Sequence, residues 1–200
     1  MYSTMVDRIY TDDVIEPDRY DFLSIVFHWA TLLLIGLLFW SASAHEGAQD
    51  GDTAARLLEL HRSVGVIIWL LTLLRLAWKA SGGHVPALPA TTGKLQAIGA
   101  RGTQWAMYAL LIAQPLSGLL QSIWRGKAFP LLLGELPPLV PRDKALMHLA
   151  HDMHEWGAQL FIAFIAVHAL AGLFHGLVRR DGVLGSMLPF PRTARCRNQG

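Results

Sequence analysis

Four long apolar stretches constrain the fold of this chain more than any other feature. They cover residues 22–44, about 57–78, about 103–124 and about 147–178. A helix needs about 20 apolar residues to cross a bilayer, at about 1.5 Å per residue. Only 16% of the 200 residues are charged, against about 25% in soluble domains. The sequence therefore predicts an all-α membrane protein, a bundle of four transmembrane helices.

The segments outside these stretches divide the chain into three parts. We expect an acidic N-terminal extension over 1–20, a four-helix domain over 21–190 and a polar tail over 191–200. The extension lacks the apolar core of a secretory signal. The single cysteine, Cys196, lies in the tail, so neither a disulfide framework nor a cysteine-linked haem is indicated. We expect Pro115 and Gly118 to kink the third helix, and the apolar residues 131–133 to lie at the membrane interface.

The basic residues predict the orientation of the bundle. With the N-terminus inside, eleven of the 17 Lys and Arg residues fall on the cytoplasmic side and six on the outer side. This bias favours cytoplasmic termini, and the inverted insertion is the alternative. The net charge of +2 and the lack of a basic block give no indication of nucleic-acid binding.

Four of the nine histidines fall at two matched depths in the predicted helices. His154 and His168 are 14 residues apart, which places them about 40° apart around the helix and about 21 Å apart along it. His61 lies at the outer level of His154, and His28 lies at the inner level of His168. Paired histidines on facing helices, without a nearby carboxylate or thiolate, suit axial ligation of haem iron.

Two further histidines compete for these places. His151 is one turn from His154 but about 100° off the face of His168. His175 shares a face with His168, so depth alone leaves open which of them is the partner of His28. Each histidine taken singly could also be a packing or interface residue. We read His45, His84 and His148 as solvated.

Other residues near the two levels are candidates for contacts with a haem. Arg75 lies 14 residues after His61 and could either bind haem propionates or reach the inner headgroups. Arg62 could serve the outer level in the same way. Trp29, beside His28, could pack on a porphyrin, whereas most of the other six tryptophans fall near span ends, as membrane-belt residues do.

Several short motifs of this chain, in this order and spacing, resemble the prokaryotic cytochrome b561 family of membrane di-haem cytochromes. They are FHW at 27–29, LHRSVGV at 60–66, LLRL at 73–76, QPLSG at 114–118, HEW at 154–156, VHALAGLFH at 167–175 and LGSMLP at 184–189. The resemblance implies two non-covalent haems b, each with two histidine ligands, in the bacterial inner membrane. It pairs His28 with His168 and His61 with His154. It also makes His175 a candidate quinone or propionate contact.

The resemblance implies electron transfer between a donor and the membrane quinone pool, with ubiquinone as the expected substrate. Some family members are similar to superoxide oxidases, so cations on the outer loops could steer superoxide; these are Arg62, Arg125, Lys127, Arg142 and Lys144. His175, Asp181 and Glu155 are candidate proton sources for a quinone. The alternative function is the cytochrome b membrane anchor of a larger dehydrogenase or hydrogenase, with a partner oxidoreductase subunit. A histidine-lined transporter is a third possibility, but the chain shows no inverted repeat.

Overall fold

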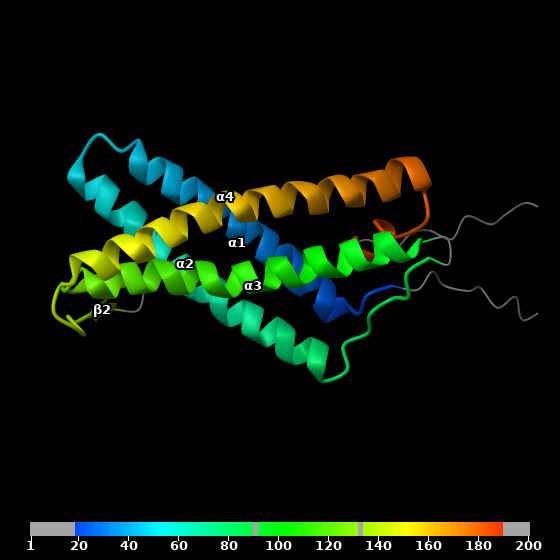
Figure 1. Cartoon of the computed structure of the whole chain (residues 1–200), viewed down its shortest axis with the longest axis horizontal. Coiled ribbons are helices and arrows are strands. Elements are labelled where there is room, and N and C mark those ends of the chain that lie inside the picture. Colours follow the sequence, from blue (N-terminus) through cyan, green and yellow to red (C-terminus); the bar gives the residue numbers. More distant parts are fainter. Residues whose placement is uncertain (1–18, 90–91, 132–133, 190–200) are drawn as a thin grey trace, which may run out of the picture.

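The computed structural model of the protein describes residues 19–89, 92–131 and 134–189. It contains four long helices, α1 (Phe22–Glu46), α2 (Gly51–Ala80), α3 (Lys94–Trp124) and α4 (Lys144–Phe174) (Figure 1). All four are long and apolar enough to cross a membrane. The predicted all-α bundle is confirmed. The polar tail and all but the last two residues of the N-terminal extension lie outside the described residues, so the division into three parts stays a prediction.

Aspartate residues cap the N-termini of three of the four helices. A carboxylate at this position accepts a hydrogen bond from a backbone N–H that has no partner inside the helix. Asp21 accepts from the N–H of Ser24 at 2.9 Å, and Asp50 accepts from that of Thr53 at 2.8 Å. Asp143 accepts in the same way from Leu146 at 3.0 Å. These polar caps fix where α1, α2 and α4 start.

The helices extend beyond the predicted apolar spans. α2 starts at Gly51 instead of about 57, and α3 starts at Lys94 instead of about 103. Hydropathy detects only the part of a helix that lies in lipid, whereas the hydrogen-bonded backbone continues into water. A short antiparallel hairpin, β1 (Phe129–Leu131) and β2 (Gly134–Leu136), lies between α3 and α4, where the sequence predicts no regular structure but only an apolar segment at the membrane interface. α4 continues into a π-helical turn, His175–Arg179, and a 3-10 turn follows at Gly185–Met187.

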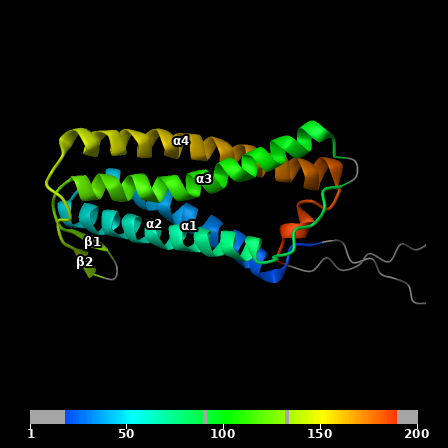
Figure 2. The ribbon, with the colours of Figure 1, turned by 60° about the horizontal axis from the view of Figure 1, so that its bottom comes forward.

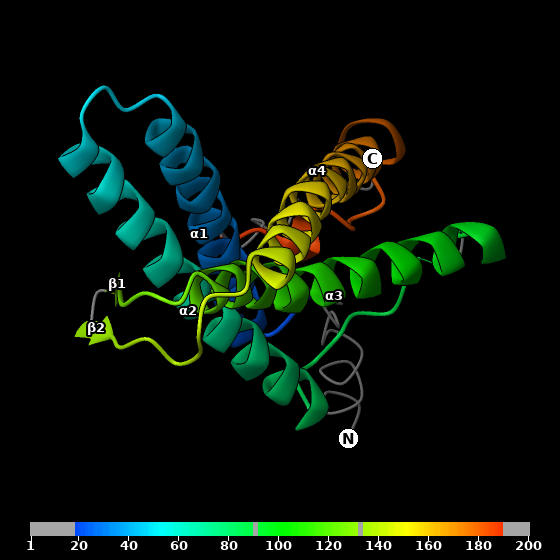
Figure 3. The same cartoon turned by 60° about the vertical axis from the view of Figure 1, so that its left-hand side comes forward.

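The four helices form two antiparallel hairpins. α1 packs along α2, α3 packs along α4, and α2 also packs on α3. By contrast, the backbones of α1 and α2 make little or no close approach to that of α4. Figure 2 shows the helices running along one long axis, and Figure 3 shows the α1–α2 hairpin diverging from α4. α4 is therefore joined to the rest of the bundle mainly through α3.

The buried apolar core lies near mid-depth in the bundle. It consists of Ile35, Ile68, Tyr108, Leu111 and Phe161, drawn from all four helices. Many large apolar side chains elsewhere are exposed, such as Leu33 at 73% and Leu170 at 65%. Exposed apolar surface of this extent belongs against lipid in a membrane protein.

Residues near the two ends of the described chain contact each other at one end of the bundle. The N–H of Tyr20 donates to the carbonyl of Ser186 at 3.3 Å, and Trp29 Nε1 donates to the carbonyl of Met187 at 2.9 Å. Trp78 Nε1 donates to Asp21 at 3.0 Å. The start of α1, the end of α2 and the segment after α4 therefore lie together. We call this end of the bundle the inner end, in line with the predicted orientation.

Candidate functional site

The structure brings His61 of α2 and His154 of α4 together near the outer end of the bundle. Their ring centroids are 6.1 Å apart, at an interplanar angle of 84°. Two imidazoles that share one metal ion have centroids about 6 Å apart, because each metal–nitrogen bond is about 2 Å long and the nitrogen lies about 1 Å from its ring centre. The separation therefore fits a pair of axial ligands across one iron.

Hydrogen bonds fix the orientation of both outer rings. His61 Nδ1 lies 3.1 Å from the carbonyl of Leu38 and 3.3 Å from Ser41 Oγ. His154 Nδ1 lies 2.9 Å from the carbonyl of Gln114 and 3.1 Å from Ser117 Oγ. A carbonyl only accepts, so each Nδ1 carries the proton. The lone pair of each ring is then on Nε2, where a metal can bind it.

The QPLSG motif of α3 lies against the His154 ring. Pro115 stands inside this helix, which is continuous from Lys94 to Trp124. The carbonyl of the preceding residue, Gln114, accepts from His154. The QPLSG motif thus provides the orienting carbonyl of Gln114 and the hydroxyl of Ser117. It also provides Gly118, where a Cβ would lie 3.1 Å from the His154 ring.

A cavity of about 820 Å³ surrounds the outer pair. It lies at the upper end of the usual range for ligand sites, about 300–1,000 Å³. Both histidines line it, together with Gly65 and Gly118. A Cβ on Gly65 would meet nothing within 4 Å, which leaves open space beside α2 where a flat group could approach the backbone. The cavity and the ring spacing together fit a haem at this level.

The inner level holds a second pair of the same spacing. The ring centroids of His28 and His168 are 6.1 Å apart, at an interplanar angle of 63°. The structure therefore places His168, and not His175, opposite His28. Among the described residues, neither ring of this pair makes a hydrogen bond, in contrast to the outer pair. Trp29 lies edge-on to His28, with centroids 5.9 Å apart, and its Nε1 donates a hydrogen bond to the carbonyl of Met187.

Arginine residues lie near both histidine pairs. Arg62 lies in the wall of the outer cavity with Arg125, close enough for the two cations to repel each other. The Arg62 guanidinium lies 5.4 Å above the ring of the buried Phe129 in the hairpin. At the inner level, Arg75 interacts electrostatically with both His28 and His168. Positive charge is thus available beside both histidine pairs.

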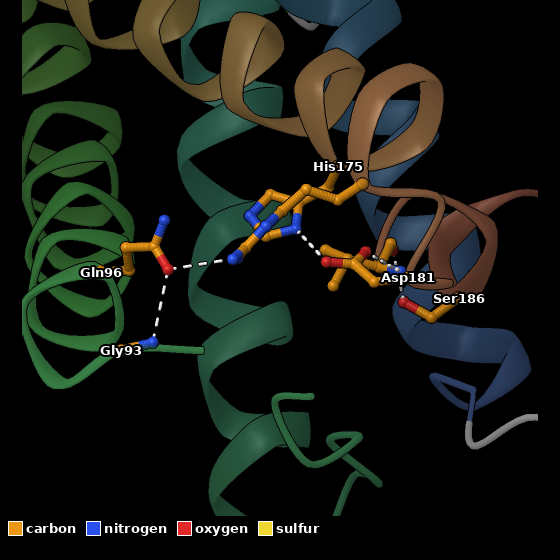
Figure 4. A network of polar contacts seen from close by, with 7 residues as sticks. Gly93, Gln96, His175, Asp181 and Ser186 are labelled. Atoms are coloured by element: carbon orange, nitrogen blue, oxygen red, sulfur yellow. Dashed lines mark hydrogen bonds and ion pairs between the residues drawn. The ribbon is translucent and has the colours of Figure 1, made fainter. Parts of the chain in front are cut away.

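His175 lies at the first position of the π-helical turn and pairs with Asp181. Its Nδ1 is 2.6 Å from Asp181 Oδ2, and both side chains are largely buried (Figure 4). Burial acts to raise the pKa of Asp181, but hydrogen bonds from His175 and from the N–H of Val183 outweigh it. The pKa of this carboxyl is therefore lowered. Arg179, at the end of the same turn, donates to Gln96 Oε1 of α3 at 3.1 Å. π-Helical turns often mark functional positions.

The remaining histidines are not brought into either pair. His151 is half exposed and lies 3.1 Å from Gln121 and 3.7 Å from Glu155. His84 and His148 are exposed, as predicted. The prediction for His45 is wrong, because this side chain is part-buried and donates to the carbonyl of Ala54 at 2.8 Å. No group of three or more potential metal ligands occurs within residues 19–89, 92–131 and 134–189.

Sequence reasoning missed the groups that orient the outer histidines. Ser41 is fully buried and Ser117 is 7% exposed, but a serine in an apolar span gives no signal of its partner. It also missed Lys79, which lies one turn after Arg75 and contacts α3. A charged residue at the end of a span is usually read as a headgroup contact, so only the fold reveals what it faces.

Four membrane-spanning helices with a histidine pair at each of two depths define a membrane cytochrome b type of bundle. The sequence pattern of prokaryotic cytochrome b561 matches residues 19–190. The chain belongs to the prokaryotic cytochrome b561 family. It is accordingly a haem-binding electron-transfer protein that spans the bacterial inner membrane several times.

Three curated relatives are similar over nearly the whole chain. Cytochrome b561 homolog 1 of Escherichia coli (strain K12) is 27% identical over 86% of this chain and 98% of its own length. Cytochrome b561 homolog 2 of the same organism is 26% identical, over 86% of this chain and 92% of its own length. The probable superoxide oxidase CybB of Yersinia pestis is 28% identical, over 87% of this chain and 98% of its own length.

Proposed function

We propose that this protein transfers electrons from superoxide at the outer membrane face to a quinone near the inner face. In the overall reaction, two superoxide anions each lose one electron and become O₂. One quinone takes up both electrons and two protons and becomes the quinol. Haem b, when bound, supplies reversible one-electron iron chemistry. The protein positions the cofactor, sets its surroundings and handles protons.

The ligand roles follow from the two histidine pairs. His61 and His154 are proposed to bind one iron through Nε2, and His28 and His168 a second. Two histidine ligands leave no open coordination position, so the chain would exchange electrons through the edge of each cofactor. The axial separation of the pairs is about 21 Å, from the 14 residues between His154 and His168.

The outer cavity supports superoxide as the donor. Arg62 and Arg125 line its wall, and neither guanidinium is paired with a carboxylate among the described residues. Cations that line an opening attract small anions and raise their encounter rate. The relative from Yersinia pestis is named a probable superoxide oxidase, and it covers the same length of chain. Lys127, Arg142 and Lys144 add positive charge on the outer loops.

The inner end supplies the protons in this proposal. His175 is held by Asp181 through Nδ1, so Nε2 is the ring atom available to a quinone oxygen. A carboxylate that accepts from one nitrogen of a histidine fixes its tautomer and leaves the other nitrogen free to exchange a proton with a ligand. Arg179 ends the same turn and Arg180 follows it, at the predicted cytoplasmic side. Glu155 lies at the outer end of α4, so it is too far from the inner end to supply protons to a quinone bound near His175.

The observation that carries the proposal is the matched spacing of two histidine pairs at opposite ends of one bundle. The test supplies the purified chain with enzymatically generated superoxide and a soluble ubiquinone, and follows quinol formation by absorbance. We expect quinol formation that superoxide dismutase abolishes. A colourless protein would remove the haem assignment. A haem-loaded protein that reduces quinone only with a partner subunit would favour the membrane-anchor function instead.

A further inference from the structure

Two cations lie next to each other at the inner end of α2. Arg75 and Lys79 are one helical turn apart and interact electrostatically. They line one small pocket together with Tyr20, Gln104 and Tyr108. Like charges spaced four residues apart destabilise a helix unless another group compensates them. Their juxtaposition therefore requires an explanation.

Neighbouring aromatic and amide groups of α3 hold both cations. The Arg75 guanidinium lies 5.5 Å from the centroid of the Tyr108 ring. Lys79 Nζ lies 5.2 Å from the ring of Trp105 and 5.5 Å from that of Tyr108, and it donates to Gln104 Oε1 at 3.3 Å. These contacts orient the two cations but do not neutralise them. Within the described part of the chain, no carboxylate pairs with either cation.

The pocket adjoins the inner histidine pair. Arg75 interacts electrostatically with both His28 and His168, so this cation lies within reach of the inner pair, and Lys79 follows one turn later on α2. A haem b carries two carboxylates on one edge of its ring. Two adjacent cations beside the inner pair match two adjacent carboxylates in charge and in number.

We propose that Lys79 and Arg75 form a two-cation clamp for the propionates of the haem held by His28 and His168. This proposal rests on the haem ligands assigned in the proposed function. Lys79 is the new element, since it extends the site one turn beyond the cation already suggested by sequence. It acts together with Arg75, so that each carboxylate has its own counter-charge.

Tyr20 provides an additional donor to the same pocket. It lies just before α1, and its backbone N–H donates a hydrogen bond to the carbonyl of Ser186. Burial, with a smaller effect of Tyr108, raises the pKa of Tyr20, so its hydroxyl stays protonated and can donate to a carboxylate. The clamp thus consists of Tyr20, which precedes α1, and of Arg75 and Lys79 on α2. Side chains of α3 hold the two cations in place.

A lipid phosphate at the inner surface is the competing occupant, because lysine near a helix end commonly reaches a headgroup. The geometry favours the propionates. Lys79 is part-buried and turned onto the rings and amide of α3, instead of extending away from the bundle. Arg75 is also placed a turn deeper than Lys79, toward the inner histidines.

The test compares Lys79→Met, Lys79→Arg and the control Lys94→Met in the full-length holoprotein. Lys94 is exposed at the start of α3, so its loss removes one charge at the same end without touching the pocket. Haem content is measured, and a redox titration gives the midpoint potential of each haem. A nearby cation stabilises the more negative, reduced haem. We expect Lys79→Met to shift one of the two potentials to more negative values, with the other unchanged, and Lys79→Arg and Lys94→Met to resemble wild type.

Each variant is measured in neutral detergent and in nanodiscs that contain anionic lipid. A shift in both media supports the clamp, because no phosphate headgroup is needed for it. A shift confined to anionic lipid assigns Lys79 to headgroups and overturns the clamp. Equal potentials in Lys79→Met and Lys94→Met also overturn it, as does a change in quinone KM alone. A wild-type protein without an inner haem would overturn the proposed function itself.

Discussion

The two outer histidines differ from a neighbouring histidine in the partner of the Nδ1 atom. At the outer level, each paired ring gives its Nδ1 proton to a backbone carbonyl, Leu38 for His61 and Gln114 for His154. His151 lies one turn from His154, yet it is half exposed and its Nδ1 faces the side chain of Gln121. Two neighbouring histidines on one helix thus have separate surroundings.

This difference gives a matched pair of variants. His154→Ala removes one proposed ligand of the outer iron, and we expect the haem bound per polypeptide to fall by about half. His151→Ala removes an exposed side chain and should leave the haem content unchanged. Pyridine haemochrome quantitation on purified protein measures both. Full haem content with an unaltered spectrum in His154→Ala would show that the ligand is another residue.

Helix α3 contributes through its backbone and its small residues. Gly118 lets α3 approach the ring of His154, and Gly99 lies near the start of the same helix with nothing within 4 Å of an added Cβ. Both positions are helical, so alanine should lower the free energy of the helix itself by about 1 kcal/mol in each case. The two alanine substitutions should therefore stabilise the helix equally, but only the one at Gly118 should affect the site.

We expect Gly118→Ala to displace the His154 ring, because the new Cβ would lie 3.1 Å from it, closer than an ordinary contact. The outer haem should then be retained about 10-fold less tightly, as for loss of an orienting contact at a metal site. Gly99→Ala should bind haem normally and melt at the same or a higher temperature. Haem transfer to apomyoglobin measures the retention. Equal transfer rates in the two variants would contradict this role of Gly118.

The molecule as a whole places both described ends of the chain at one face. Hydrogen bonds from Tyr20 to Ser186 and from Trp29 to Met187 join the start of α1 to the segment after α4. The proposed electron path runs from the other face toward this one. Its direction in the cell depends on which face is cytoplasmic.

The distribution of basic residues predicts that this face is cytoplasmic. A green fluorescent protein fused to the C-terminus should therefore fluoresce, and alkaline phosphatase at the same position should be inactive. The matched control carries either reporter in the loop between α1 and α2, after Gly47, where the activities should be reversed. Active phosphatase at the C-terminus would mean that the bundle is inverted and that superoxide would have to approach from the cytoplasm.

The sequence alone determined the four spans, because burial of a helix in lipid depends only on a run of apolar side chains. It also determined the two depths of the histidines, since helix rise converts residue number into height. It could not choose between His168 and His175 as the partner of His28, because both share a face. The fold decides this by ending α4 at Phe174 and turning His175 toward Asp181.

Only the tertiary structure revealed what lies between the helices. Ser41, Ser117 and the carbonyl of Gln114 orient histidines on other helices, and their partners are 20, 37 and 40 residues away in the chain. The hairpin beneath Arg62 and the pocket that joins Arg75 to Lys79 likewise depend on how α2 meets its neighbours. Periodicity and hydropathy describe one helix at a time, whereas these contacts are set by the packing of separate helices.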